Sequence, residues 1–324
     1  MKNIRVRIKS AIILFSIIIP FFFITYFAKL PGKIIGLSFF AVLAAWATYE
    51  VLSHSVLKRW ENILITLLTT LIWAMPLDWY NANDSNNIFI NKSATGFDIN
   101  ELLIQLKHAV FFGNDTLTSF RTLQILIIST VISLIYLINL FTIKEAKYKA
   151  KKIAVSFFVA LFATIFIPLA FKTLFIYNWA SLYYVFAIAI IPIVTDTMAY
   201  VGGSLLGKKI IKVGMAPRIS PKKSWEGTFI GFLFGALFVF IVMYLGKMTN
   251  NKTFTIFTNW KQLVVGIFVL PIISILGDLL FSLIKRLYDI KDFSNLIPGH
   301  GGFMDRFDSL TCVIMATSAI LLIN

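Results

Sequence analysis

Three aspartates near the end of the chain have the residue type and the spacing to bind a divalent cation. Asp278 lies inside the apolar run PIISILGDLLFSLIKRLYDIKD, and Asp305 and Asp308 follow in GGFMDRFDS. A helix through the second segment would place Asp305 and Asp308 on one face, because residues three apart in a helix are neighbours. An ionised carboxylate within an apolar run is costly unless it faces protein, water or a cation. The three aspartates are therefore predicted ligands of magnesium, which prefers oxygen donors. One ion or two, and an added monovalent cation, are all compatible with them.

Basic residues accompany the aspartates and are predicted to hold phosphate oxygens. Asp278, Ser282, Lys285 and Asp289 recur at helical spacing and form one stripe leading toward the cytoplasm. An alternative is an internal Asp-to-Lys ion pair that only stabilises helix packing. Besides Asp278 and Asp305, the predicted catalytic residues are Lys285, Arg286 and Arg306, and Ser282 and Lys291 are predicted substrate ligands.

A glycine-rich loop, PGHGG, precedes the last apolar run. Glycines let the backbone approach a ligand closely, and amide groups near a helix start suit an anion. We therefore predict that His300, Gly301 and Gly302 contact a substrate phosphate.

A third polar block spans residues 195–228 and contains the spacing Gly202-x4-Gly207-Lys208. This resembles a phosphate-binding P-loop, but Lys209 stands where Ser or Thr is needed and no strand is predicted before it, which excludes that fold. The predicted substrate ligands in this block are Ser220, Lys222 and Lys223. The alternative is a cytoplasmic loop whose positive charge only sets the topology.

The elements that must position these residues are membrane helices. Hydrophobic residues make up 58% of the 324 residues, and the candidate spans are 11–28, 34–52, 62–77, 122–143, 153–171, 174–195, 228–246, 263–283 and 309–323. Continuously apolar runs of about 20 residues favour helices over a barrel, whose strands alternate. The predicted fold is therefore all-α, a polytopic integral membrane helical bundle of about nine transmembrane helices.

Charge and motif positions suggest how the chain is organised. Most of the 30 lysines and arginines fall on one side of the predicted spans, which puts the amino terminus in the cytoplasm. The same bias explains the net charge of +15 without nucleic acid. Residues 1–150 are predicted to hold the N-terminal helices, with an extracytoplasmic loop near 78–121, and residues 151–324 to form the catalytic region. The lone Cys312 excludes a disulfide framework.

At residues 282–309 the stretch SLIKRLYDIKDFSNLIPGHGGFMDRFDS resembles the signature of the phosphatidate cytidylyltransferase (CDP-diacylglycerol synthase) family. Further blocks that resemble this family are DTMAY at 196–200, SPKKSWEG at 220–227 and GD at 277–278. The resemblance covers about 190–309. Residues 1–189 resemble the family only in being polytopic.

The resemblance implies transfer of a cytidylyl group from CTP to phosphatidate, giving CDP-diacylglycerol and pyrophosphate in phospholipid biosynthesis. It implies magnesium at Asp278 and Asp305 with Asp308 nearby, and a homodimer. The charge distribution predicts a multi-pass protein of the cell membrane with the active site at the cytoplasmic face. Two residues depart from the family pattern, Phe281 where Glu is frequent and Met198 where Gly is frequent.

Three other functions are alternatives to this one. A transporter would place charge at mid-membrane in paired broken helices, whereas these charges gather at one surface. A CDP-alcohol phosphotransferase would carry a D-G-x-x-A-R helix, which the chain lacks. An inactive relative retained for membrane assembly is the third alternative, and Phe281 is the residue that favours it.

Overall fold

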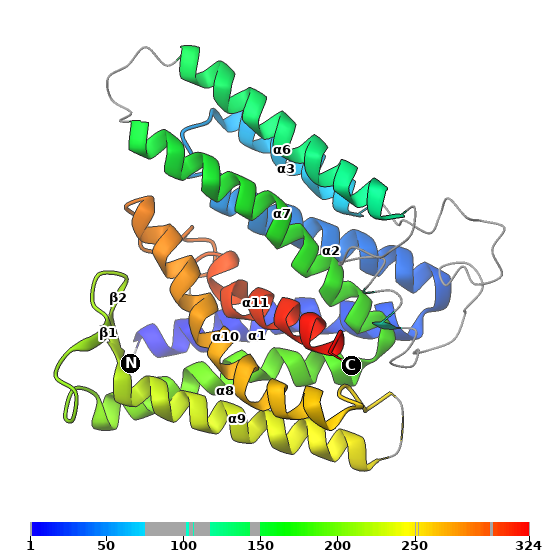
Figure 1. Cartoon of the computed structure of the whole chain (residues 1–324), viewed down its shortest axis with the longest axis vertical. Helices are drawn as coiled ribbons and strands as arrows, with labels where there is room; N and C mark the ends of the chain where they lie inside the picture. The colour runs from blue at the N-terminus through cyan, green and yellow to red at the C-terminus, as the bar shows by residue number, and fades with distance from the viewer. Residues whose placement is uncertain are drawn as a thin grey trace. The chain divides into compact units, whose positions relative to one another are not determined.

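The computed structural model describes residues 2–74, 102–103, 106, 117–142, 150–249, 251, 253–298 and 301–323. The long helices among these residues are α1 (Lys2–Phe27), α2 (Lys29–Leu52), α3 (Arg59–Ala74), α6 (Leu117–Thr142), α7 (Ala150–Ala180), α8 (Leu182–Leu206), α9 (Trp225–Met248), α10 (Trp260–Leu287) and α11 (Met304–Leu321) (Figure 1). The predicted apolar runs lie mainly in these helices, and the run 174–195 is divided between α7 and α8. The helical fold class is therefore confirmed.

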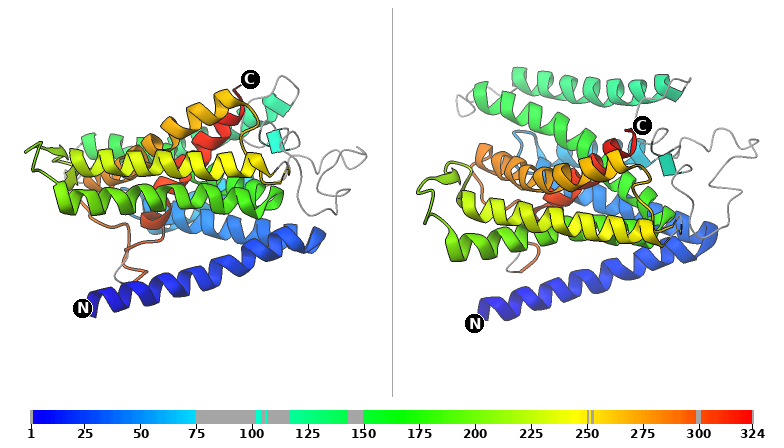
Figure 2. Two further views of the ribbon diagram at one scale, coloured as in Figure 1. Left: turned by 90° about the horizontal axis from the view of Figure 1, so that it is seen from below. Right: turned by 60° about the horizontal axis from the view of Figure 1, so that its bottom comes forward.

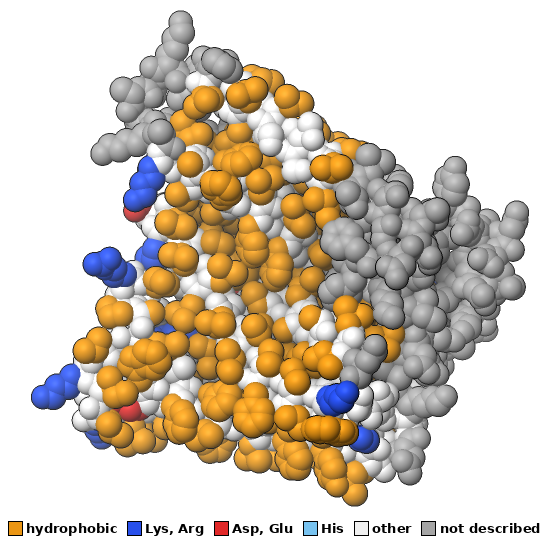
Figure 3. Space-filling view, viewed as in Figure 1, with side chains coloured by type: hydrophobic (Ala, Val, Ile, Leu, Met, Phe, Trp, Pro, Cys, Tyr) orange, Lys and Arg blue, Asp and Glu red, His pale blue; other side chains and the backbone are white. Residues whose placement is uncertain are grey.

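Within the described ranges, five helices are long and apolar enough to cross a membrane: α2, α7, α8, α9 and α10. Many large hydrophobic side chains are exposed on the described helices, as expected for surfaces that face lipid. Hydrophobic side chains are also spread over the described part of the face seen in Figure 3. The protein is therefore a helical, multi-pass membrane protein.

The structure differs from the sequence-based expectation in two places. The predicted boundary between the spans 153–171 and 174–195 is wrong, because α7 continues to Ala180 and α8 begins after Ser181, whose side chain accepts a hydrogen bond from the Tyr183 amide. The all-α prediction also missed a small antiparallel hairpin formed by β1 (Gly214–Ala216) and β2 (Ser220–Ser224).

The chain divides into two compact units, each made of segments distant in sequence. The first unit holds the described residues of Met1–Thr95, Ile104–Ile176 and Leu287–Asp305, and the second holds those of Gly96–Leu103, Tyr177–Arg286 and Arg306–Asn324. The sequence-based division at residue 150 separates the N-terminal helices from the region that carries the motifs. That division stays a prediction.

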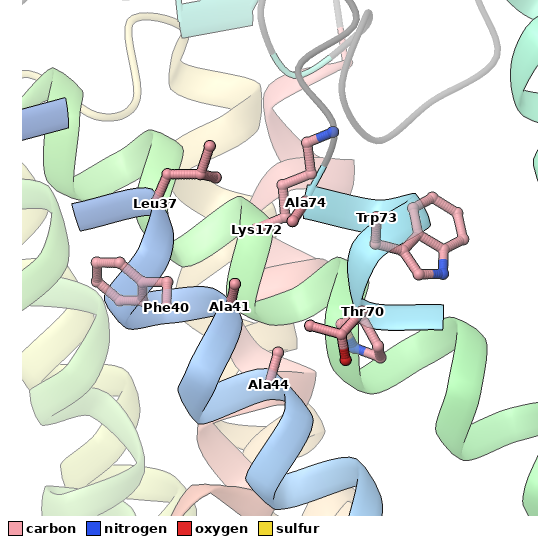
Figure 4. Close-up of a pocket in the computed structure, with 9 residues that line it drawn as sticks. Leu37, Phe40, Ala41, Ala44, Thr70, Trp73, Ala74 and Lys172 are labelled. Carbon is pink, nitrogen blue, oxygen red and sulfur yellow. The ribbon is translucent and has the colours of Figure 1, made fainter. Parts of the chain in front are cut away.

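In the first unit, α3, α6 and α7 share a hydrophobic core that includes Ile65, Trp73 and Ile132. The indole Nε1–H of Trp73 donates to the Thr164 carbonyl at 3.2 Å, so the largest side chain of this core is also hydrogen-bonded. A small pocket lined mainly by apolar side chains of α2, α3 and α7 lies beside Trp73 (Figure 4).

In the second unit, α8 and α9 run side by side in all three ribbon views (Figures 1 and 2). Glycines on α9 allow the close approach: a Cβ added at Gly227 would lie 2.6 Å from the Ala199 carbonyl, and one added at Gly231 would lie 2.6 Å from the Thr195 carbonyl. Small residues at such a contact let two helix backbones pack tightly. This packing sets the position of Asp196, which lies between these two contacts on α8.

Candidate active site

The hairpin and α10 meet in an ion pair. Lys223 Nζ, on β2, lies 2.6 Å from Asp278 Oδ2, on α10, and both side chains are largely shielded from solvent. The Ser282 hydroxyl donates to Asp278 Oδ1 at 3.3 Å, as the predicted helical stripe implies. Two blocks recognised separately in the sequence, SPKKS and GD, therefore meet at Asp278. The ion-pair partner of Asp278 in this structure is Lys223 rather than Lys285.

Asp308 lies in a charged environment at the beginning of α11. Its side chain is 9% exposed, and Oδ1 accepts a hydrogen bond from the Ser309 amide at 2.7 Å. Burial raises the pKa of the Asp308 carboxyl above its usual range. The negative charges of Asp278 and Asp196 add to the increase, and the positive charge of Lys285 opposes it. Carboxylates from α8, α10 and α11 therefore act on one another electrostatically within the second unit.

Asp196 was not among the predicted site residues. It is exposed on α8, and the charges of Asp278, Lys223 and Arg306 act on its carboxylate. The signal that pointed to it was its place at the start of DTMAY, one of the blocks that resemble the family. Spacing along the chain could not associate it with Asp278, because the two residues lie on different helices.

The predicted basic ligands have different surroundings. Lys285 is buried at 8% exposure and acts on Asp308, whereas Arg286 donates from Nε to the Ile219 carbonyl in the turn of the hairpin at 3.2 Å. Lys222 is exposed on β2, next to Lys223. Arg306 is exposed in the first turn of α11. Lys285 and Arg306 thus lie near the carboxylates, and Arg286 supports the hairpin.

The hairpin itself is anchored at both ends. Ser224, the last residue of β2, accepts a hydrogen bond from the Gly227 amide and caps α9. Glu226 in the first turn of α9 accepts hydrogen bonds from the amides of Lys208, Ile210 and Ile211. These contacts hold the basic segment before β1 on the start of α9 and keep β2, with Ser220 and Lys223, in place.

The glycine-rich loop belongs to the first unit. Gly301 has φ of +85°, which favours glycine, and its amide donates to the Ile297 carbonyl. The Gly302 amide donates to Asp305 Oδ2 at 2.8 Å, and the Phe293 amide donates to the same oxygen at 3.0 Å. Of the amides predicted to bind an anion, those of Gly301 and Gly302 are therefore bonded within the chain in this structure. Lys291 is exposed, and His300 lies outside the described residues.

The donor types at the site suit magnesium. Asp196, Asp278 and Asp308 supply carboxylate oxygens in one unit, and their mutual repulsion would be reduced by a bound cation. In the part of the chain that the structure describes, no three His, Cys, Asp or Glu side chains are grouped so as to hold one ion. Asp305 lies in the other unit, with one oxygen engaged by two amides. The metal site therefore stays a prediction.

Comparison with known proteins identifies the family. The chain matches the model of the cytidylyltransferase family over residues 6–323. It is 39% identical to phosphatidate cytidylyltransferase of Haemophilus influenzae over 37% of this chain and 38% of that protein. It is 36% identical to the Rickettsia bellii enzyme of the same name over 40% of this chain and 52% of that protein. These two alignments span about half or less of the relatives' length. A Staphylococcus saprophyticus protein of the same name is 28% identical over 98% of this chain and 99% of its own length. Because the family model matches almost the whole chain, this protein belongs to the cytidylyltransferase family.

Proposed function

We propose that this protein transfers the cytidylyl group of CTP to phosphatidate, forming CDP-diacylglycerol and pyrophosphate. The observation that carries the proposal is the cluster in the second unit, where Asp278 pairs with Lys223 and lies among other carboxylates and bases. The segments that supply this cluster carry the blocks that resemble the family. The names of the relatives support the same substrate pair.

The reaction requires alignment and charge neutralisation more than a general base. A phosphate oxygen of phosphatidate attacks the α-phosphorus of CTP, a new P–O bond forms, and the bond from the α-phosphorus to the bridging oxygen breaks. The bond electrons leave with pyrophosphate, and no proton has to be removed from the nucleophile. The charged groups of the site must therefore hold two anionic substrates close together and stabilise the departing charge.

The basic residues of the cluster are assigned to the phosphates. Lys223, Lys285 and Arg306 lie near the carboxylates and would neutralise phosphate oxygens, and Arg286 would keep the hairpin beside α10. The ammonium of Lys223 would exchange Asp278 for a substrate phosphate when the nucleotide binds. The further substrate ligands we assign are Ser220, Lys222, Ser282, Lys291, His300, Gly301 and Gly302. Gly301 and Gly302 would contact a phosphate after their amides exchange Ile297 and Asp305 for it.

Magnesium is assigned to Asp278, Asp305 and Asp308. When bound, it would neutralise charge on the nucleotide phosphates. Carboxylate oxygens are suitable ligands for magnesium, which supports this assignment. Asp305 is included because of its position in the sequence signature. Whether one ion or two are needed is decided by metal titration of the purified protein.

The topology we propose has nine crossings, the amino terminus in the cytoplasm and the active site at the cytoplasmic face. Single cysteines placed in the polar segments of a Cys312→Ser variant, treated in intact cells with a membrane-impermeant maleimide, test this arrangement. Labelling near residues 208–223 would contradict it. We also propose a homodimer, and light scattering of the detergent-solubilised protein measures its mass.

The direct test uses the purified protein in lipid nanodiscs with labelled CTP. With phosphatidate and magnesium, we expect labelled CDP-diacylglycerol and one pyrophosphate for each product molecule. A chelator should stop the reaction, and renewed magnesium should restore it. Diacylglycerol, which lacks the attacking phosphate, is the control acceptor. Absence of product from phosphatidate, or equal transfer to diacylglycerol, would overturn the proposal.

A further inference from the structure

Glu50 is a buried acidic residue near the end of α2 that no sequence motif had marked. Its side chain is 4% exposed, and it lies within the candidate membrane span Pro31–Leu52. An ionisable side chain buried in such a helix requires partners that compensate for lost hydration. The partners of Glu50 therefore indicate what it does.

Among the described residues, the donors to the Glu50 carboxylate come from the segment that leads into α11. Oε1 accepts hydrogen bonds from the Ser294 hydroxyl and, at 3.0 Å, from the Phe303 amide. Oε2 accepts from the Met304 amide at 2.6 Å. Every one of these residues belongs to the first compact unit. Glu50 thus binds the loop and the helix start together.

These contacts replace a local helix cap. The first amides of a helix have no partner within it, and a nearby Ser, Thr, Asp or Asn usually accepts from them. The sequence before Met304 is Gly301-Gly302-Phe303, which offers no such side chain. Asp305 accepts a hydrogen bond from the Gly302 amide, and Glu50 accepts from the next two amides, those of Phe303 and Met304. Its negative charge also complements the positive end of the helix dipole.

A second residue of the same segment binds the other end of the loop. His54 follows Glu50 by four residues, and its Nε2–H donates to the Phe293 carbonyl at 2.6 Å. The Phe293 amide donates to Asp305 Oδ2. The end of α2 therefore holds the segment 293–304 at both ends, through Phe293 and through Met304.

We propose that Glu50 is a positioning residue: by accepting the first amide hydrogens of α11, it sets where this helix begins and how its first turn presents Asp305, Arg306 and Asp308. α11 is one continuous helix from Met304 to Leu321, so a change at its start rotates or displaces that turn. The kinetic form of this inference rests on the proposed function.

The matched pair of variants is Glu50→Gln and Glu61→Gln. Glu61 is 5% exposed in the same unit and accepts from the Lys58 amide at 2.8 Å, so it caps its own helix, α3. We expect Glu50→Gln to lower kcat by about 10-fold to 100-fold with a smaller change in KM for CTP, since misplaced groups slow the chemical step. Glu61→Gln should keep kcat within about twofold of the wild-type value. Its loss of thermal stability should be similar to that of Glu50→Gln.

Wild-type kcat in Glu50→Gln would overturn the inference. Equal losses of kcat in both variants would also overturn it, because they would show a general effect of burying an amide in place of a carboxylate.

A second experiment does not depend on how well Glu50→Gln folds. A Cβ added at Gly302 would lie 2.6 Å from Glu50 Oε1, so Gly302→Ala should displace the carboxylate and lower kcat. Glu50→Asp shortens the side chain and makes room for the added methyl group. The double variant should therefore be more active than Gly302→Ala alone, and additive losses would overturn the inference.

Amide hydrogen exchange gives a readout without catalysis. In Glu50→Gln, the amides of Phe303 and Met304 should exchange faster than in Glu61→Gln. If the wild type proves inactive, the proposed function fails while this exchange test still decides the role of Glu50. Unchanged exchange at both amides would overturn it.

Discussion

Lys223 on the hairpin and Asp278 within α10 form an ion pair with 2.6 Å between Nζ and Oδ2. The two residues are 55 positions apart in the chain. The hairpin positions the lysine beside the helix because Ser224 and Glu226 anchor the hairpin on α9. The pair is partly open to solvent, so its contribution to folding is modest. Its position among other charged groups points to a role in binding and turnover.

Replacing Lys223 with Met should lower kcat/KM by about 100-fold, because a cation that stabilises transferring phosphate is lost. The measurement is the initial rate at several CTP concentrations. Lys247→Met is the control, since Lys247 lies exposed in the last turn of α9, far along the helix from the hairpin. Comparable losses in the two variants would show that general charge, and not this lysine, is responsible.

Asp278→Asn and Asp305→Asn should each abolish turnover while the protein still expresses and migrates as wild type in size-exclusion chromatography. The amide removes a negative charge and weakens an oxygen ligand of a hard cation. Manganese binding, followed by electron paramagnetic resonance in the presence of CTP, should weaken in both variants. Near-normal activity in both would remove the proposed metal site.

Asp196→Asn should lower kcat by about 10-fold or more if this carboxylate belongs to the charged cluster that neutralises the transferring phosphate. Asp289→Asn is the control. The Asp289 side chain is 81% exposed, it forms a long ion pair with Lys152 at 4.0 Å, and its φ of +58° suits Asn. An Asp196→Asn variant as active as Asp289→Asn would exclude Asp196 from the site.

Gly231→Ala should destabilise the protein by about 1–3 kcal/mol, because the added methyl group would overlap the backbone of α8 and force α8 and α9 apart. A Cβ at Gly203 meets only the Ser224 hydroxyl, at 3.3 Å, and the Gly227 Cα, at 3.8 Å, so Gly203→Ala is the matched control. Thermal unfolding in detergent, monitored by tryptophan fluorescence, compares the two. Equal melting temperatures of the two variants would show that α8 and α9 can move apart without a loss of stability.

The sequence alone determined the helical membrane fold and the family. Apolar runs near the length of a membrane crossing require helices, because backbone amides find no water in lipid. The blocks DTMAY, SPKKSWEG, GD and the segment 282–309 predicted the family, and the family model confirmed it. These signals are local, so spacing along the chain sufficed to read them.

Tertiary structure decided which residues become partners. Helical spacing suggested Lys285 as the ion-pair partner of Asp278, but in the structure the partner is Lys223, which lies on the hairpin. Asp196 and Asp278 act on each other electrostatically from different helices, and Glu50 accepts a hydrogen bond from the Met304 amide, 254 positions further along the chain. The hairpin was missed because its strands contain only three and five residues. Such contacts depend on how helices pack, and sequence periodicity carries no information about the partner on another helix.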